Sequence, residues 1–547
     1  MIIGIDVGGT HADGVLLDGG RPVAKHKVGV DRRSLGEVII LLLQQLAPAD
    51  RSRLRRLQLS STLCTNAIVT NTLDRVGMLL QSGPGLNPEF FQDSCRAWFL
   101  DGAIDHRGQI LRDPDPAAIT AAAAEIRREG LDSVAIVTKF SHRNNRHELS
   151  IARQLTDRFA HISLGHRISG LPNFPRRVYS TWLNAALMSR FNRFTDSLEM
   201  GIRHLGINCP CYVLKADGGT IPFARAREFP CESIHSGPSA SVMGCLALGV
   251  DQEDAVILDI GGTTTDIALL VDGSPLLEPY GIEIAGRPTL IRALKSRSIG
   301  LGGDSRVSLD DNGVFTIGPE RQGTSMAEGG SAPTPTDAMV VLGKLSLGSA
   351  RQAAAAMLRL HPRQEPEYTA TLLLDAFVAR IRTTVEEMIE EVFARPVYTV
   401  AALLHRRRIT PRRLIAIGGP AKAMQEFIAD GFFLPCTVPD HYEVANAIGA
   451  ARARLTVQAT LYADTGDGSL SIPEISSLES IPSRYTMADA EKRLQKAIAL
   501  MVKEMGMAAC PDIDFHERLE MNVVRGFSAS GKILNLKAQI RPGLAAI

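Results

Sequence analysis

The sequence lacks the features that would take it out of the class of ordinary globular proteins. Positive and negative side chains nearly cancel, with 60 lysines and arginines against 59 aspartates and glutamates, a formal net charge of +1. Proteins that bind nucleic acid usually carry a basic excess, so nucleic acid is not an expected partner. No apolar run approaches the ~18 residues of a membrane-spanning helix, and the first residues lack the basic segment of a signal peptide. We therefore expect a cytoplasmic protein without a membrane partner.

Cysteine and aromatic residues are also scarce. The 547 residues include eight cysteines and 5% aromatics, and the cysteines show no regular spacing, so a disulfide framework is not expected. Cys209 and Cys211 form a close pair, but they lack the two-residue gap typical of zinc and thioredoxin sites. Apolar residues make up 45% of the chain, a normal share for a globular protein. The length indicates roughly three to four domains.

One short motif occurs twice, in distant parts of the chain. Residues 256–273 read VILDIGGTTTDIALLVDG, an apolar run, a glycine pair with threonines and a second apolar run, and residues 2–17 repeat the pattern. Each copy predicts two strands joined by a glycine turn. A repeated site motif predicts duplicated lobes that face each other across one ligand; the alternative is a coincidental pair of glycine hairpins. The aligned residues are Asp6, Gly8, Gly9, Thr10 and Asp13 in the first copy and Asp259, Gly261, Gly262, Thr263 and Asp266 in the second.

The residue types in the motif suit a phosphate ligand. Glycines let the backbone approach a ligand that a Cβ atom would exclude, and hydroxyl groups can bond phosphate oxygens. Asp259, and by alignment Asp6, can hold the divalent cation that accompanies phosphate. A third glycine turn, Gly418-Gly419-Pro420, follows an apolar run. Its glycines would let a flat base or a ribose lie against the backbone.

Between these motifs, apolar runs and amphipathic stretches alternate in the rhythm of an α/β domain with a parallel or mixed sheet. We expect a first lobe over residues 1–175, its helical and linking part over 176–255, a second lobe over 256–455 and a small α+β domain over 456–547. Predicted helices cover residues 35–46, 117–128, 149–159, 179–205, 350–360, 368–394, 421–430, 445–455 and 487–505. Predicted strands cover residues 57–59, 76–80, 134–137, 211–214, 414–417, 521–524 and 533–540.

Three polar segments have two interpretations each. Residues 60–66 form a polar turn that faces a ligand, or they cap a helix. Residues 236–240 form a loop before a helix, where small residues either bind an anion or permit tight helix packing. Residues 318–335 are rich in glycine, proline, serine and threonine. We expect this stretch to be irregular, as a lid or substrate loop or as a plain surface loop.

Taken in order, the motifs resemble the superfamily of sugar kinases, actin and chaperone ATPases, and within it the hydantoinase A and 5-oxoprolinase family. The resemblance covers residues 1–455 and implies a two-lobed α/β fold of ribonuclease H-like sheets that clamps Mg-ATP. The chain departs from the family at His11-Ala12, where an aromatic or threonine-rich turn is usual, and at Asp304, where glycine is usual. The segments that carry the resemblance are Gly4 to Thr10, Thr65-Asn66-Ala67, Lys215 to Gly219, Ser236-Gly237-Pro238, Asp259 to Asp266, Ser298 to Gly303, Thr334 to Ala338 and Leu342-Gly343.

This resemblance implies an ATP-dependent hydrolase of cyclic amides, such as hydantoin, 5-oxoproline or a related lactam, that activates the substrate carbonyl by phosphoryl transfer. It also implies a second, hydantoinase B-like subunit, and we expect an oligomer. Two alternatives stay open. One is a small-molecule kinase of the same fold, and the other is an ATP-driven activator or chaperone-like protein.

Roles can be assigned to the motif residues on the same basis. Asp6 and Asp259 would hold Mg²⁺ through its waters, and with Thr10 and Thr263 they form the expected catalytic set. The expected ATP-binding residues are Gly8, Gly9, Thr10, Gly261, Gly262, Thr263 and Thr264 at the phosphates and Gly418, Gly419 and Pro420 at the adenosine. The candidate substrate contacts are Thr65, Asn66, Asp217, His235 and Asp304.

Overall fold

The first copy of the motif lies in a six-stranded sheet with the strand order β12-β11-β4-β1-β2-β3. The computed structural model describes residues 1–9, 11–30, 34–87, 90, 96–249, 253–278, 280–394, 408–507, 510–525 and 528–545. β1 and β2 pair antiparallel with Asp6 opposite Asp13, and β1 runs parallel to β4, which runs parallel to β11. The strands are β1 (Ile2–Val7), β2 (His11–Asp18), β3 (Arg21–Gly29), β4 (Arg56–Ser61), β11 (Cys211–Leu214) and β12 (Thr220–Pro222).

The second copy lies in an equivalent sheet with the order β15-β14-β13-β21-β22, in which β18 also pairs with β14. β13 and β14 are antiparallel with Asp259 opposite Asp266, and β13, β21 and β22 run parallel. Counted outward from each motif hairpin, the two sheets share strand order and direction, so the predicted sequence repeat is a repeat of the fold. The strands are β13 (Ala255–Ile260), β14 (Thr265–Val271), β15 (Ser274–Pro275), β18 (Ser296–Ile299), β21 (Arg413–Ile417) and β22 (Cys436–Thr437).

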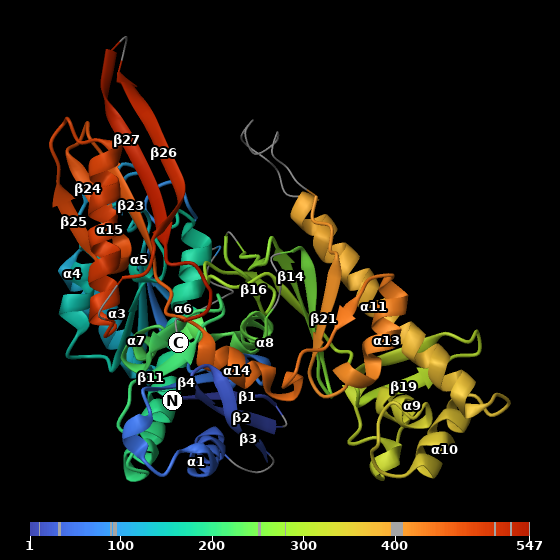
Figure 1. The fold of residues 1–547 in the computed structure, drawn as a ribbon. Helices are drawn as coiled ribbons and strands as arrows, with labels where there is room; N and C mark the ends of the chain where they lie inside the picture. The colour runs from blue at the N-terminus through green and yellow to red at the C-terminus, as the bar shows by residue number, and fades with distance from the viewer. Residues whose placement is uncertain are drawn as a thin grey trace.

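Two further sheets extend the first lobe. A parallel four-stranded sheet, β10-β9-β5-β6, is inserted between β4 and β11 in the chain, and a five-stranded C-terminal sheet, β25-β24-β23-β27-β26, packs against one helix, α15. The C-terminal sheet lies beside the inserted sheet, away from the second lobe (Figure 1). The strands are β5 (Val76–Gln81), β6 (Ala97–Phe99), β9 (Ser133–Thr138), β10 (His161–Leu164), β23 (Gln458–Asp464), β24 (Ser469–Ile472), β25 (Ser477–Ser480), β26 (Asp514–Arg525) and β27 (Ser528–Gln539).

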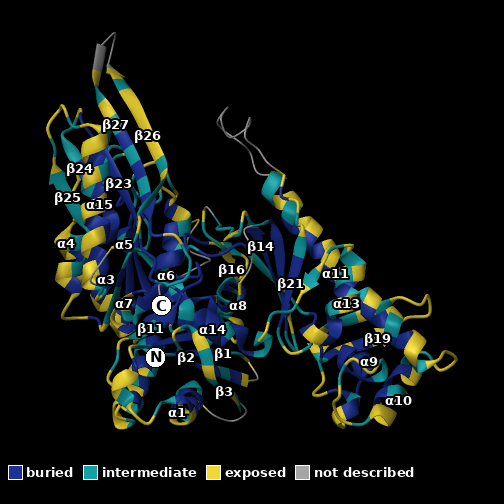
Figure 2. Cartoon of the chain, viewed as in Figure 1, coloured by how far each residue is buried: buried dark blue, intermediate teal, exposed yellow. Residues whose placement is uncertain are grey.

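The helices cover the faces of these sheets, so the strands inside the molecule are buried (Figure 2). No helix in the described ranges combines the length and apolar character that crossing a membrane requires. The helices are α1 (Leu35–Leu46), α2 (Leu63–Val69), α3 (Pro116–Arg128), α4 (Arg146–Leu155), α5 (Gly165–Ile168), α6 (Phe174–His204), α7 (Phe223–Glu228), α8 (Ser236–Ala247), α9 (Pro335–Val341), α10 (Ala350–Leu360), α11 (Pro366–Ala394), α13 (Ala421–Phe432), α14 (Ala445–Arg452) and α15 (Met487–Glu504). The short strands are β7 (Ala103–Ile104), β8 (Ile110–Arg112), β16 (Glu283–Ile284), β17 (Arg287–Pro288), β19 (Ser305–Leu309) and β20 (Phe315–Arg321).

Two helices, α8 and α14, cross where the lobes meet (Figure 1). A Cβ atom on Gly449 would lie 2.1 Å from the Ala240 carbonyl oxygen, and one on Gly244 would lie 2.2 Å from the Ala445 carbonyl oxygen. α14 also packs on β1, where a Cβ on Gly4 would lie 2.1 Å from the Ala447 carbonyl oxygen. Because backbone meets backbone at each point, the crossing requires glycine and fixes how the lobes join.

The structure decides or corrects three of the segment interpretations. For residues 60–66 it agrees with the start of a helix rather than a free turn, because α2 begins at Leu63 after Thr62, although the Thr62 side chain makes no capping hydrogen bond. Residues 236–240 are not a loop ahead of a helix, because α8 already begins at Ser236, directly after a left-handed residue, His235. Residues 318–335 are only partly irregular, since β20 continues through Arg321.

The helix crossing generates the first prediction. Gly449→Ala improves helix propensity by about 1 kcal/mol, but the new methyl group collides with the backbone of α8. We expect overpacking to dominate and to lower stability by about 1–3 kcal/mol, seen as a lower thermal midpoint. Gly237→Ala is the matched control, because Gly237 lies in α8 and a Cβ there meets nothing within 4 Å. Equal midpoints for the two variants would contradict the close crossing.

Candidate active site

The two motif carboxylates come from different lobes and share one partner. Asp6 is the last residue but one of β1, just before the turn, and Asp259 occupies the same position in β13. Asn446, in the first turn of α14, donates a hydrogen bond from Nδ2 to Asp259 Oδ2 at 2.9 Å, and it lies near enough to Asp6 for its amide to lower the pKa of that carboxyl group. Asp6 is 8% exposed. The structure therefore brings both copies of the motif to one site.

Negative charge accumulates at this site. Burial, together with the neighbouring carboxylates of Asp13 and Asp259, raises the pKa of Asp6 to about 7 against the opposing effect of its hydrogen-bond partners. Burial and the nearby charge of Asp259 likewise raise the pKa of Asp266 to about 7. Lys27 Nζ, 3.2 Å from Asp13 Oδ1, offsets part of this charge. An excess of buried carboxylate charge fits a site for a cation.

The arrangement around Asp259 fits a hydrated cation rather than a cage of protein ligands. Its Oδ2 accepts hydrogen bonds from Ser241 Oγ at 2.6 Å and from Asn446. A Cβ on Gly418 would lie 2.7 Å from Oδ1, so the glycine leaves that oxygen room. Among the described residues, no three aspartate, glutamate, histidine or cysteine side chains are close enough to hold a metal ion. Mg²⁺ commonly keeps several waters and binds through one or two carboxylates plus phosphate oxygens.

Each of the two motif turns contains an internal backbone hydrogen bond. The Gly8 amide donates to the His11 carbonyl at 3.0 Å, and the Gly261 amide donates to the Thr264 carbonyl at 2.9 Å. These two amides are therefore occupied within their turns, contrary to the expectation that they point at phosphates. Gly9 and Gly262 are the next glycines in the two turns. Thr10 lies outside the described residues.

A glycine-rich segment after β18 supports the second turn. The Gly303 amide donates to the Gly261 carbonyl at 2.9 Å, and the Asp304 amide donates to the Gly262 carbonyl at 2.7 Å. A Cβ on Gly302 would lie 2.6 Å from the Gly262 carbonyl oxygen, so a larger residue would push the turn away. Asp304, one of the candidate substrate contacts, thus supports the second motif turn through its backbone amide.

An arginine that sequence reasoning missed reaches the same turn. Arg321, at the end of β20, donates from one guanidinium nitrogen to Asp304 Oδ2 at 2.9 Å and from another to Thr263 Oγ1 at 3.4 Å. Burial raises the pKa of Asp304, while Arg321, Thr336 and also His11 of the first lobe oppose the rise. His11, which follows the first turn, is therefore close enough to Asp304, beside the second turn, to affect the pKa of that carboxyl group.

The remaining substrate candidates fall into separate places. Thr65 Oγ1 accepts a hydrogen bond from the His235 amide at 3.1 Å, so these two residues meet. Asn66, on the same helix as Thr65, donates only locally, to Thr62. Asp217 is buried elsewhere and accepts hydrogen bonds from Thr456 Oγ1 at 3.1 and 3.2 Å. The five candidates therefore do not form one cluster.

The third glycine turn joins β21 to α13. Gly418 has a φ of +90°, and a Cβ there would lie 2.3 Å from the Ile260 carbonyl oxygen, so packing alone requires glycine. At Gly419 a Cβ would meet nothing within 4 Å, and Pro420 caps α13. Of the three residues, Gly419 is the one with open space beside it.

Comparison with solved structures shows the fold. An ATP-dependent caprolactamase from Pseudomonas jessenii superposes with a TM-score of 0.75 at 19% identity, covering 100% of this chain and 88% of that one. A nucleotide-free acetone carboxylase superposes with a TM-score of 0.70 at 16% identity and the same coverage. The two-lobed α/β architecture predicted from the motifs is confirmed.

Curated relatives match a large part of the chain at low identity. Caprolactamase subunit alpha of Pseudomonas jessenii is 26% identical over 392 residues, 63% of this chain and 55% of that protein. 5-Oxoprolinase of Saccharomyces cerevisiae is 27% identical over 256 residues, 45% of this chain and 19% of that protein. Acetophenone carboxylase gamma subunit of Aromatoleum aromaticum is 22% identical over 405 residues, 63% and 53%. The matches thus span about half, or less, of the relatives' own lengths.

Two family models account for most of the chain. The hydantoinase/oxoprolinase N-terminal region matches residues 2–159, and the hydantoinase/oxoprolinase model matches residues 177–459. The matched residues include both motif copies, Asn446 and Arg321. The chain belongs to the hydantoinase/oxoprolinase family.

Proposed function

We propose that this chain is the ATP-using part of an enzyme that hydrolyses a cyclic amide, such as hydantoin, 5-oxoproline or a related lactam. One observation carries the proposal: the buried carboxylate of Asp6 and the half-buried carboxylate of Asp259, from duplicated lobes, both lie beside Asn446 and the two glycine turns, which suits a cation and a polyphosphate held between the lobes. Family membership and the names of the relatives caprolactamase and 5-oxoprolinase support a lactam as the substrate class.

The chemical problem is that an amide carbonyl is a poor electrophile. Transfer of the γ-phosphoryl group of ATP to the amide oxygen forms a new O–P bond, breaks the β–γ bridge and releases ADP. Water then adds to the activated carbon, and the C–N bond breaks to leave an acyl phosphate and the ring amine. A second water cleaves the acyl phosphate, which gives the ring-opened amino acid and free phosphate. Phosphoryl transfer needs positioning and charge neutralisation more than covalent chemistry from the protein.

The residues of this site supply both needs. Asp6 and Asp259 would hold Mg²⁺ through its waters, and the ion, when bound, offsets the charge of the phosphates. Ser241 and Asn446 fix Asp259 through its Oδ2. Gly9 with Thr10 in the first turn, and the second-turn residues together, would bind the β- and γ-phosphates. The second-turn residues are Gly262, Thr263 and Thr264.

The adenosine and the substrate need separate surfaces. We place adenosine at Gly419 and Pro420, beside the end of β21, where the backbone is open. Thr65 and His235, which already meet, are our first choice for contact with the lactam. This choice leaves Asp217 and Asp304 with structural roles. Asp217 holds Thr456, and Asp304 supports the second turn through its backbone amide.

The proposal includes a partner. Two of the relatives are named as subunits, alpha in one case and gamma in the other, so we expect a second, hydantoinase B-like subunit and a cytoplasmic hetero-oligomer. A second candidate reaction is ATP-dependent carboxylation of a ketone, which the match to acetophenone carboxylase gamma subunit favours. Kinase and activator roles have no comparable support among the relatives.

Product analysis distinguishes these reactions. Purified chain together with its partner subunit is incubated with Mg-ATP and 5-oxoproline, hydantoin or caprolactam, and free phosphate and ring-opened product are measured. We expect lactam-dependent phosphate release equal to ring opening. Phosphate retained on the product would indicate a kinase, ketone- and bicarbonate-dependent turnover would indicate a carboxylase, and ATP turnover stimulated only by a protein would indicate an activator.

Asp259→Asn tests the cation site. The substitution keeps the shape and removes the charge, so we expect ATP turnover to fall at least about 100-fold, the size typical of losing one preorganised charge-stabilising group. Circular dichroism checks that the fold is retained. Asp311→Asn, which changes an exposed carboxylate, is the control. Undiminished turnover in folded Asp259→Asn would remove this residue from the site.

Arg321 generates a separate prediction. Its guanidinium contacts Thr263 and Asp304, within reach of a phosphate at the second turn, where positive charge stabilises the transition state more than bound ATP. We expect Arg321→Ala to lower kcat about 100-fold or more with a small change in KM. Arg306→Ala, which changes an exposed arginine on the neighbouring strand paired with Glu320, should have little effect. A change in KM alone would assign Arg321 to ground-state binding.

A further inference from the structure

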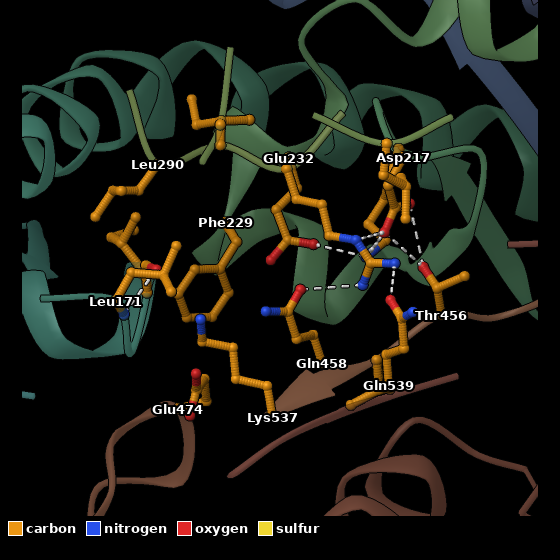
Figure 3. A pocket seen from close by; sticks show the side chains of 18 of the residues that line it. Leu171, Asp217, Phe229, Glu232, Leu290, Thr456, Gln458, Glu474, Lys537 and Gln539 are labelled. Carbon is orange, nitrogen blue, oxygen red and sulfur yellow. Dashed lines mark hydrogen bonds and ion pairs between the residues drawn. The ribbon is translucent and has the colours of Figure 1, made fainter. Parts of the chain in front are cut away.

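A cavity of about 340 Å³ lies between the first lobe and the C-terminal domain (Figure 3). Its walls come from the loop after β11, from α7 and the residue that follows it, from the segment before β18 and from strands β23 and β27. None of the glycine-turn residues or their carboxylates lines it. The volume lies in the range of small-molecule sites. We propose that this cavity binds a small carboxylic acid with a short apolar chain, with the carboxylate against Arg225.

Arg225 supplies the charge that selects the carboxylate. Its guanidinium lies 3.7 Å from the centre of the Phe229 ring and is 18% exposed. In the described part of the chain its one carboxylate within ion-pair range is Glu228, at 3.7 Å, which is too long for a hydrogen bond. Arg167 takes the same oxygen of Glu228 at 2.9 Å. Two guanidinium groups therefore share one carboxylate. The charges of Glu232 and Glu504 also act on Arg225, but neither carboxylate lies within ion-pair range of it, so its donors stay open to a ligand.

Glu228 is not among the residues that line the cavity, so it offsets part of the charge of Arg225 without occupying the space beside it. A guanidinium presents its donors in a planar fork that matches a carboxylate in two parallel hydrogen bonds. The fork of Arg225 has no such partner within the described residues. A ligand carboxylate would supply one.

The opposite wall is neutral and already paired. Lys215 Nζ lies 3.2 Å from Asp217 and 3.3 Å from Glu232, and Arg292 lies 3.7 Å from Asp217. Gln458 and Gln539 accept further hydrogen bonds from Arg292, as Figure 3 shows. This network of two cations and two anions has no net charge, so it does not favour a second charged group on the ligand. The one group in these walls that calls for an anion is therefore Arg225.

Other charged groups near the cavity are likewise paired. Glu474 accepts backbone hydrogen bonds on both oxygens, from Gly170 at 3.2 Å and from Thr460 at 3.1 Å. Lys537 pairs with Glu517. Apolar side chains occupy the space between the charged walls, and they would contact the body of the ligand rather than its carboxylate. They include Leu171, Ile221, Phe229 and Leu290.

The inference does not depend on the proposed reaction, because the assay uses the full chain without nucleotide. Isothermal titration with hexanoate should show saturable binding with a Kd of roughly 1 mM or tighter, within reach of so small a ligand. Hexanamide, which has the same shape without the charge, should bind about 10-fold to 100-fold more weakly, the size of a lost charged hydrogen bond. No binding of hexanoate, or equal binding of hexanamide, would overturn the proposal.

Variants locate the binding. Arg225→Gln should weaken hexanoate binding about 10-fold or more, and Arg225→Lys should keep part of the affinity because it keeps the charge. Arg112→Gln, an exposed arginine outside the cavity, is the matched control. Leu171→Trp narrows the cavity without touching Arg225 and should also abolish binding. Thermal melting verifies that each variant folds.

The outcomes separate this site from other anion sites. Inorganic phosphate that binds as tightly as hexanoate, or hexanoate affinity unchanged in both folded Arg225→Gln and Leu171→Trp, would overturn the assignment. A chain that does not bind hexanoate could still turn over ATP, and a chain that does not hydrolyse lactams could still bind hexanoate. The two proposals can therefore fail separately.

Discussion

The structure depends on one costly arrangement, in which the buried carboxylate of Asp6 and the half-buried carboxylate of Asp259, from different lobes, lie close to each other beside the side chain of Asn446. The pKa of Asp6 and of Asp266 is raised to about 7 by burial and by neighbouring charge. When folding raises the pKa of a carboxyl group, the free energy of unfolding falls as the pH rises from the unfolded-state pKa to the folded-state pKa. The reason is that only the folded state disfavours the charged form. Near neutral pH these groups therefore oppose folding until a cation offsets them. The same carboxylate charge would attract a cation to the junction of the lobes, and the cation would in turn attract phosphates.

The close helix crossing makes this arrangement possible. Ser241 on α8 and Asn446 on α14 both bond Asp259 Oδ2, so the carboxylate is held from two helices that belong to different parts of the chain. Gly244 and Gly449 let those helices approach until backbone meets backbone. A change in the crossing angle would move both hydrogen bonds at once. The geometry of the site and the packing of the lobes are therefore one constraint.

Much of the fold could be predicted because its signals are local. The helix at residues 35–46 was predicted with its observed bounds, since an apolar stripe follows a serine that forms a capping box. The repeated motif likewise predicted two equivalent sheets. The segment at residues 236–240 was wrongly predicted as a loop, since α8 already begins at Ser236. Of its two predicted roles, tight helix packing agrees with the contact of the Ala240 carbonyl at the helix crossing. Asp6 and Asp259 could be named from the motif, whereas Ser241, Asn446 and Arg321 could not, because no local pattern distinguishes them from other polar residues. The division into four domains at the predicted bounds stays a prediction.

The tertiary links also connect the cavity to the site at the turns. The Ala216 carbonyl, next to Asp217, accepts a hydrogen bond from Ser239 Oγ of α8 at 2.6 Å. Asp217 itself accepts from Thr456, shortly after α14. The loop that forms one wall of the cavity is thus tied to α8, which holds Asp259, and to the segment that follows α14. A ligand that shifts this loop would act on α8 directly and on α14 through the residues that follow it. The two places are therefore joined by direct hydrogen bonds rather than by a long chain of contacts.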